Sequence, residues 1–385
     1  ERQRKESAPN AEWMTDKELA SMTYERGSGA ILLGKHNAEW IGSEDDRHLM
    51  TVAGSRAGKS STCLKPNLLL WPSSVMCIDP KGELASSTAM ARHRMGQDVF
   101  ILDPFGEVKG EAAQFRVNYN PLNELRITGR DNVIDDAAMI AEALIVPDKS
   151  GEQHWTLSAK NLVRGLILHA MRIEEKGGGK ADLNLIREMI TAPLGEDGQT
   201  PDDGKIWLST IFNLMMKDED GFDGVVSGVG GTMHGKPKGE RGSIISTAVE
   251  QTAFLDSSPM QSHLLDDRLP SLRLLKRKPT TIYLVLPASR MATHFRWLRL
   301  ILTLALSSLE REEMRLNHPV LFVLEEFPQL GYMRQIEAAA GLMAGYGVKL
   351  WTVLQDLSQI KALYRDSWET FIGNAGVIQA FGNTD

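Results

Sequence analysis

The sequence predicts an α/β fold whose parallel sheet is interrupted by a block of helices. From Arg47 to about Asp103, short runs rich in β-branched residues alternate with helical stretches. From about Pro121 this alternation gives way to apolar residues at helical spacing, and it returns at Thr280. Because strands lie on both sides of the helical block, we expect one domain to be inserted into another.

Each expected element follows from its local pattern. Strands are expected first at residues 48–53, 75–78 and 98–102, separated by helices at 60–70 and 83–95. Pro72 and Gly96 end these two helices. The helical block includes expected helices at 131–145 and 155–173. The sheet resumes with strands at 280–286, 320–324, 348–354 and 376–381, and with helices at 297–309 and 333–346.

This order divides the chain into three segments. Residues 1–121 and 266–385 form the two parts of the sheet domain, and residues 122–265 form an inserted all-α domain. The chain begins with Glu1 and stops directly after the last apolar run, so we expect a fragment cut at both ends, with a truncated sheet. The apolar run 297–309 carries Arg299 and is shorter than the about 20 residues that span a bilayer, so we expect this fragment to be soluble.

The composition is that of a globular protein. Of 385 residues, 42% are hydrophobic and 24% are charged, which excludes a disordered or fibrous chain. The formal net charge is −7, so a nucleic acid would have to meet a local patch or a channel. Cys63 and Cys77 each lie in an apolar stretch and are expected to be buried thiols in a reducing compartment.

Two polar segments are interpreted as solvent-exposed. Residues 221–242 are so rich in glycine that we expect a mobile surface loop, with contact to a substrate as the alternative. The second segment is a basic cluster, for which a solvated face is favoured over contact with DNA or an acidic partner. It contains Arg268, Arg273, Lys276, Arg277 and Lys278.

The turn after the first strand has the pattern of a phosphate-binding loop. It reads Ala53-Gly54-Ser55-Arg56-Ala57-Gly58-Lys59-Ser60-Ser61. Small residues let backbone N–H groups surround phosphate oxygens, Lys59 can reach the β- and γ-phosphates, and the Ser60 hydroxyl can hold Mg²⁺. The strict pattern has glycine where this chain has Ala53, which is acceptable if that residue keeps φ below zero. We therefore expect ATP and Mg²⁺ as cofactors.

A second signal is the pair of acids that follows the strand at 320–324. Glu325 and Glu326 end an apolar strand, and such ionised pairs are costly to bury without a function. A nucleotide hydrolase needs one acid for the metal, here Glu325, and one to polarise the attacking water, here Glu326. Aspartate is usual at the first position, so we expect the longer side chain of Glu325 to contact magnesium with a different reach.

Two further segments can reach the same edge of the sheet. Gln355 closes the next strand and would lie level with the acids, where it can sense the γ-phosphate. The second segment follows the second strand and reads Asp79-Pro80-Lys81-Gly82-Glu83. It could face the same edge of the sheet, but a plain turn before a helix explains it at least as well as a role in the site. The expected catalytic residues are Lys59, Glu326 and Gln355.

With these segments in place, the sequence resembles the coupling proteins of type IV secretion, the TraG/TraD and Vir-type family. The motifs that carry the resemblance are the residues 53–61 and 79–83, Leu102-Asp103-Pro104-Phe105, Asn120-Pro121-Leu122, Glu325-Glu326-Phe327-Pro328-Gln329-Leu330-Gly331, Gln355-Asp356-Leu357-Ser358-Gln359, Trp368-Glu369-Thr370 and Phe381-Gly382-Asn383-Thr384-Asp385. They span nearly the whole chain, and the runs after Glu326 and Gln355 are more specific than the phosphate-binding loop.

The resemblance implies a RecA-like P-loop nucleotide-binding domain with an inserted all-α domain. It also implies an ATP-hydrolysing homo-hexamer at the cytoplasmic side of the bacterial inner membrane, held by an N-terminal anchor that precedes Glu1. Its partners would be components of the secretion channel and relaxase–DNA complexes or effector proteins. The family's arginine finger has no obvious match, and the candidates are Arg334, Arg56, Arg296 and Arg299.

Two other functions stay open at this point. The chain could be a nucleotide-binding receptor platform without motor activity of its own, an alternative that the glutamate at position 325 and the missing finger favour. It could also be a DNA-pumping ATPase of the chromosome-segregation kind with the same RecA-like core. The sequence does not decide between DNA and protein as the cargo.

Overall fold

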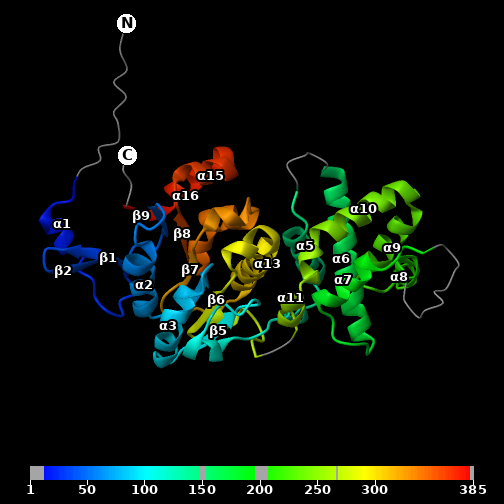
Figure 1. The fold of residues 1–385 in the computed structure, drawn as a ribbon, viewed down its shortest axis with the longest axis horizontal. Coiled ribbons are helices and arrows are strands. Elements are labelled where there is room, and N and C mark those ends of the chain that lie inside the picture. The colour runs from blue at the N-terminus through cyan, green and yellow to red at the C-terminus, as the bar shows by residue number, and fades with distance from the viewer. Residues whose placement is uncertain (1–12, 148–152, 196–206, 266–267, 382–385) are drawn as a thin grey trace, which may run out of the picture.

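The computed structural model contains a parallel sheet with its covering helices and, beside it, a block of helices (Figure 1). It describes residues 13–147, 153–195, 207–265 and 268–381. The strands come from the first and last parts of the chain, and the helical block comes from the middle. This arrangement confirms the α/β fold with an all-α insertion. The boundaries at 121/122 and 265/266 remain a proposal.

The main sheet has seven strands in the order β5-β6-β4-β7-β8-β3-β9, and every pair is parallel. The strands are β3 (His48–Ala53), β4 (Val75–Ile78), β5 (Asp98–Leu102), β6 (Thr280–Leu284), β7 (Val320–Leu324), β8 (Val348–Leu354) and β9 (Ala375–Phe381). Ile78 lies opposite Leu324, which lies opposite Thr352. The carboxyl ends of β4, β7 and β8 therefore meet at one edge.

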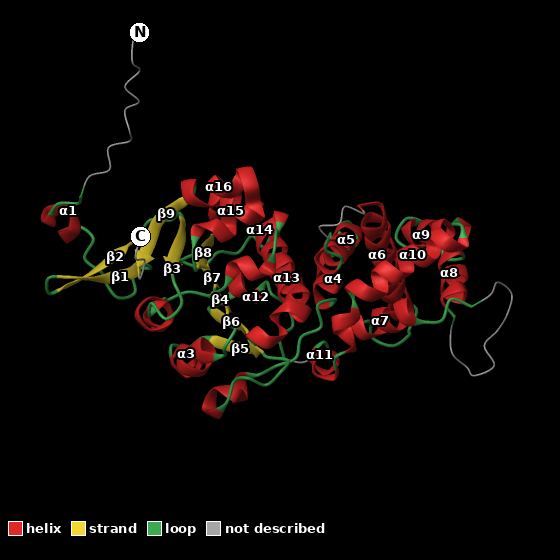
Figure 2. Ribbon diagram, turned by 45° about the horizontal axis from the view of Figure 1, so that its top comes forward, coloured by secondary structure: helices red, strands yellow, loops and turns green. Residues whose placement is uncertain are grey.

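Both faces of the sheet are covered at its inner strands, which is why these strands are buried along their whole length. Val75 and Cys77 of β4 point into one core, and Met76 and Ile78 point into the other. Helices α2 (Lys65–Leu70) and α3 (Glu83–Arg94) cover the first face. Helices α13 (Ala288–Arg311) and α14 (Arg334–Leu342) cover the second (Figure 2). The short helices α15 (Leu357–Tyr364) and α16 (Glu369–Gly373) follow β8.

The helical block shares the second core, because α5 packs against α13. Its helices are α4 (Asn123–Thr128), α5 (Val133–Leu144), α6 (Gln153–Glu175), α7 (Leu183–Thr191), α8 (Leu208–Met216), α9 (Val225–Gly235), α10 (Lys238–Gln251) and α11 (Ser258–His263). The block is joined to the sheet domain by Glu124, a buried carboxylate at the start of α4. Its oxygens accept hydrogen bonds from Tyr119, from Ser271 and Leu272, and from Ser308 of α13.

The prediction of a mobile loop at residues 221–242 is wrong, because most of this segment forms α9 and the start of α10. Val226, Val229 and Met233 are buried along one face of α9. Glycines on that face allow close approach of neighbouring helices: a Cβ on Gly230 would lie 2.8 Å from the Cβ of Met215 in α8. The glycines therefore serve helix packing rather than chain freedom.

This packing predicts opposite effects for two adjacent substitutions. Gly230→Ala should lower the free energy of unfolding by about 1 to 3 kcal/mol, because the added methyl overlaps α8. Gly231→Ala is the matched control, because a Cβ there meets nothing within 4 Å. It should raise stability by about 0.5 to 1 kcal/mol through helix propensity. Urea denaturation measures both, and equal effects would contradict the packing role.

Three other features differ from the sequence expectations. A hairpin of β1 (Ile31–His36) and β2 (Glu39–Ser43), with α1 (Asp16–Ala20) before it, was not predicted. The basic cluster is not simply a solvated face, because Lys276 is buried and donates to the carbonyls of Leu309 and Glu312. The helix expected at 297–309 extends over the whole of α13.

Both cysteines are buried free thiols, as expected.

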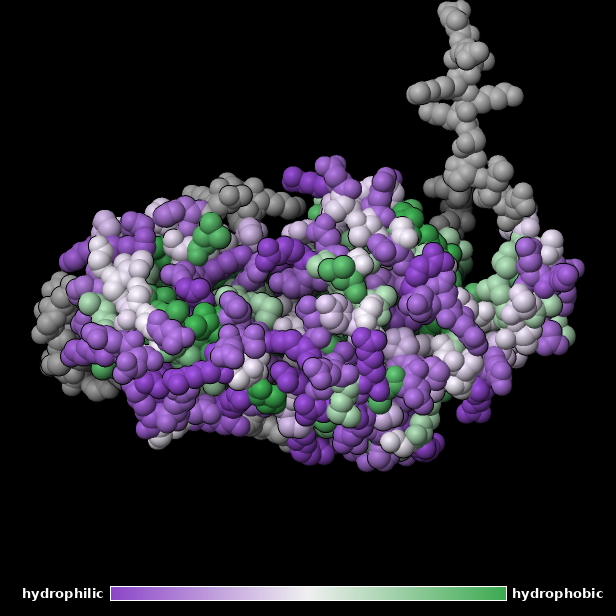
Figure 3. All heavy atoms as spheres, turned by 180° about the vertical axis from the view of Figure 1, so that it is seen from behind, coloured by the Kyte–Doolittle hydropathy of each residue, from purple (hydrophilic) through white to green (hydrophobic). Residues whose placement is uncertain are grey.

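The surface seen in Figure 3 is mostly hydrophilic, with hydrophobic residues in small separate groups. Among the helices of the described residues, none is long and apolar enough to cross a membrane.

Candidate functional site

The loop between β3 and the π-helical turn at Ser60–Leu64, which leads into α2, has the backbone that a phosphate-binding loop needs. Gly58 has a φ of 89° and Arg56 a φ of 63°, so the chain reverses tightly here. The loop is closed by the Gly58 carbonyl, which accepts from the backbone N–H groups of Ser61 and Thr62 at 3.1 and 3.0 Å. Ala53 is the buried last residue of β3 and is absent from the residues with positive φ, so alanine fits in place of the usual glycine.

The two acids lie directly beside this loop. Glu325 and Glu326 follow β7, and the Lys59 ammonium lies 3.1 Å from Glu326 Oε1. The Ser60 hydroxyl donates to Glu325 Oε1 at 3.1 Å. Gln355 Nε2, at the end of β8, donates to Glu326 Oε2 at 3.0 Å. The structure therefore brings together the five residues to which the sequence assigned metal binding and catalysis.

The backbone and burial of the acids set them apart from ordinary loop residues. Glu326 has a φ of 55°, a left-handed conformation that is uncommon for glutamate and is held here by its contacts with Lys59 and Gln355. Glu325 is buried, and its burial, together with the charge of Asp79, raises its pKa above the usual range. Burial also raises the pKa of Asp79 to about 6. A cation at this edge would therefore be favoured electrostatically.

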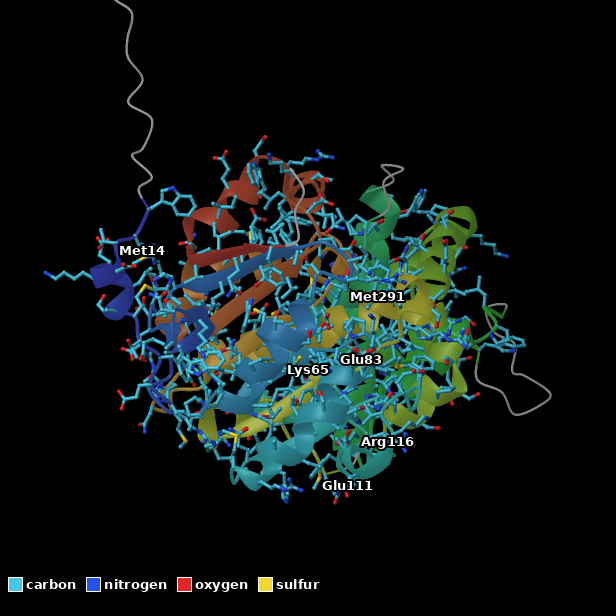
Figure 4. All side chains as sticks on the ribbon, turned by 60° about the vertical axis from the view of Figure 1, so that its left-hand side comes forward. Met14, Lys65, Glu83, Glu111, Arg116 and Met291 are labelled. Carbon is cyan, nitrogen blue, oxygen red and sulfur yellow. The ribbon has the colours of Figure 1, made fainter. Side chains whose placement is uncertain are left out.

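A cavity of about 430 Å³ opens over these groups. It is lined by Ser55, Arg56, Gly58, Lys59, Ser60, Ser61, Lys65, Pro80, Lys81, Glu83, Glu325 and Glu326. Lys65 of α2 and Glu83 of α3, both labelled in Figure 4, lie near each other on the face turned to the viewer. Lys65 was not predicted, and its position one turn into the helix after the loop could have indicated it. The turn at residues 79–83, left open by the sequence, does reach the cavity.

The hydroxyl of Ser61, a residue of the expected nucleotide-binding loop, makes a hydrogen bond within the loop itself. It donates to the Gly58 carbonyl at 3.0 Å, so it helps to close the loop from within. Gly54 and Ala57 contribute in the same way, because the Ala57 N–H donates to the Gly54 carbonyl at 3.3 Å. The backbone N–H groups of Ala57 and Ser61 are therefore already engaged within the loop.

The residues present fit a nucleotide with magnesium. The side chains of Arg56, Lys65 and Lys81 line the cavity and make no hydrogen bond or ion pair with any described residue, so all three can turn to an anionic ligand. A hydroxyl beside one buried carboxylate is a donor set suited to a hard cation that keeps several waters. A larger cavity, about 670 Å³, lies between α6, α7 and α8, but its lining is mostly apolar and suits no phosphate.

The four arginines considered for a trans-acting role differ in what they contact. Arg299 is buried and donates to the carbonyls of Leu330 and Tyr332 at 2.8 and 2.7 Å, which makes it part of the framework below the acids. Arg296 donates to Gln251 of α10. Arg334 has a side chain 71% exposed, and Arg56 lines the cavity. Only the last two are placed to meet another molecule.

The fold and this cluster define a RecA-like P-loop domain. The sequence profile of the family described as "Type IV secretory system Conjugative DNA transfer" matches residues 4–385. The chain belongs to this family.

Curated relatives agree with that assignment. The chain is 28% identical over 327 residues to the conjugal transfer protein TraG of Escherichia coli, covering 82% of this chain and 49% of that protein. It is 26% identical over 365 residues to the protein VirD4 of Agrobacterium fabrum, covering 92% and 50%. The chain thus spans about half the length of the curated relatives it matches.

Among solved structures, the fold is similar to the plasmid coupling protein TrwB. In complex with a non-hydrolysable ATP analogue, TrwB matches with a TM-score of 0.66 and 16% identity, over 97% of this chain and 80% of that chain. In complex with ADP and Mg²⁺ it matches with a TM-score of 0.66 and 15% identity, over 95% and 77%. At this identity the likeness establishes the fold.

Proposed function

We propose that this chain is the nucleotide-binding part of an ATP-hydrolysing coupling protein that passes relaxase–DNA complexes or effector proteins to a type IV secretion channel. The observation that carries the proposal is the contact of Glu326 with both Lys59 and Gln355, which joins the phosphate-binding loop to the ends of β7 and β8. Family membership supports it, as do the ATP analogue, ADP and Mg²⁺ held by TrwB.

The roles of the residues follow from their positions. The loop at 53–61 offers N–H groups to phosphate oxygens, and Lys59 leaves Glu326 to bind the β- and γ-phosphates. Ser60 and Glu325 would hold Mg²⁺, which supplies charge neutralisation of the phosphates when bound. Glu326, once freed from Lys59, orients and polarises the attacking water, and Gln355 holds the Glu326 carboxylate and contacts the γ-phosphate.

The setting of this activity is also part of the proposal. We infer a homo-hexamer on the cytoplasmic side of the bacterial inner membrane, with an anchor outside this chain. Its partners would be the secretion channel and the cargo. The helical block between β5 and β6 would bind the cargo. The conjugation and secretion relatives support this setting. The family's closing signature falls partly on residues 382–385, which lie outside the described residues.

Transfer by the full-length protein in its bacterial host tests this function. Lys59→Ala should abolish transfer of plasmid or effector while the protein remains at normal abundance, because the phosphates lose their main cation. Transfer at the wild-type level would overturn the proposal. Glu326→Gln separates the motor from a receptor platform: a motor loses transfer but keeps cargo binding, whereas a platform keeps both.

A further inference from the structure

The turn that follows β4 holds one side of the cavity rigidly. It runs from Asp79 to Gly82, and the Gly82 N–H donates to the Asp79 carbonyl at 3.2 Å. Gly82 has a φ of 65°, and a Cβ there would lie 3.2 Å from Val108. Pro80 fixes the first corner of the turn. The position of Lys81 is therefore set by the framework even though its side chain is exposed.

The carboxylate of Asp79 is buried and accepts a hydrogen bond within the protein, so it does not face the cavity as a free charge. Its Oδ2 accepts from the Ala85 N–H at 2.8 Å, so the buried carboxylate caps the first turn of α3. One of the free N–H groups at the N-terminus of α3, that of Ala85, is thereby satisfied from within the protein. This leaves Lys81 as the group through which this turn can attract an anion, and its ammonium has no partner among the described residues.

The sheet places Lys81 on the side of the acids. Strand β4 pairs with β7 so that Ile78 lies opposite Leu324, and the residues after them, including Lys81 and the two glutamates, line the same cavity. A water polarised by Glu326 must attack the terminal phosphate, so that phosphate has to lie near the end of β7. The phosphate nearest to Lys81 is therefore the terminal one.

We propose that Lys81 binds the γ-phosphate of a nucleoside triphosphate and so makes the site distinguish triphosphate from diphosphate. This inference rests on the nucleotide-binding function proposed above. Its physical reason is charge: Glu83, Glu325 and Glu326 line the cavity where the terminal phosphate must enter, and Lys59 is shared between Glu326 and the phosphates. A second cation on the acid side offsets the repulsion that these carboxylates exert on the last phosphate.

Calorimetric titration of the 385-residue chain tests the assignment, with the Mg²⁺ complexes of a non-hydrolysable ATP analogue and of ADP as ligands. Lys81→Gln should weaken binding of the analogue about tenfold and leave ADP affinity within about twofold. Lys81→Arg should recover most of the analogue affinity. Lys238→Gln, an exposed lysine on α10, is the matched control and should change neither affinity. Because the Lys81 side chain makes no hydrogen bond or ion pair with any described residue, thermal unfolding without ligand should not change.

The outcomes separate this inference from the function on which it rests. If the wild-type chain binds the nucleotides and Lys81→Gln changes neither affinity, or weakens both equally, the assignment of Lys81 is overturned and the nucleotide site stands. If the wild-type chain binds neither nucleotide, both are overturned. A selective loss of analogue affinity supports the assignment.

Discussion

Replacing Glu326 with glutamine should lower ATP turnover by the full-length protein by about 100-fold to 10,000-fold. The amide cannot take a proton from the attacking water, but it keeps the size of the side chain and can still accept from Lys59 and Gln355. Binding of a non-hydrolysable ATP analogue should stay within a few-fold of wild type. Phosphate release measures turnover, and titration with the analogue measures binding.

The control for this prediction is Glu310→Gln, which changes an exposed glutamate in the last turn of α13 that does not line the cavity. It should leave turnover unchanged. If Glu326→Gln keeps turnover within a few-fold of wild type, Glu326 is not the group that activates water. If Glu326→Gln also loses nucleotide binding, the carboxylate is needed for the structure of the nucleotide site rather than for catalysis.

The largest expected effect on stability belongs to Glu124. Glu124→Ala should lower the free energy of unfolding by about 3 to 5 kcal/mol. The carboxylate accepts from the Tyr119 hydroxyl at 2.7 Å, the Leu272 N–H at 2.7 Å, the Ser308 hydroxyl at 2.9 Å and the Ser271 hydroxyl at 3.0 Å. Its removal leaves these donors in the interior without an acceptor and loosens the junction between the helical block and the sheet domain.

Urea denaturation of the 385-residue chain measures this loss. Glu188→Ala, an exposed glutamate of α7, serves as the control and should change stability by no more than about 0.5 kcal/mol. Glu124→Gln should cost less than Glu124→Ala, because the amide oxygen can still accept from some of the donors. A cost below about 1 kcal/mol for Glu124→Ala would show that the four hydrogen bonds do not hold the junction.

Much of the sheet could be predicted because its signal is local. The bounds expected for β3, β4, β5, β7 and β8 agree with the structure. A strand buried on both faces is a continuous apolar run, which can be recognised in the sequence without knowledge of the neighbouring strands. The meeting of Lys59, Glu326 and Gln355 was predictable for a related reason. Parallel strands share a carboxyl edge, so residues that end different strands converge whatever their separation in sequence.

The features that could not be predicted depend on distant partners. The glycines of α9 suggest a loop in the sequence, because the reason for them is the close packing of Gly230 against Met215 of α8. Glu124 reads as an ordinary helix residue, because Ser308 lies 184 positions away. Lys276 reads as a surface cation, because the carbonyls that bury its ammonium belong to the end of α13 and the residue that follows it. In each case the sequence shows the residue type but not the surface that it meets.

The measurement that tests the central claim most directly is a titration of the 385-residue chain with the Mg²⁺ complex of a non-hydrolysable ATP analogue. Wild type should bind one nucleotide per chain, and Lys59→Ala should weaken binding by about 100-fold, because the Lys59 ammonium contacts the acid pair at the phosphate-binding loop and would bind the phosphates there. Absence of binding by the wild-type chain, or equal affinity in Lys59→Ala, would contradict the account.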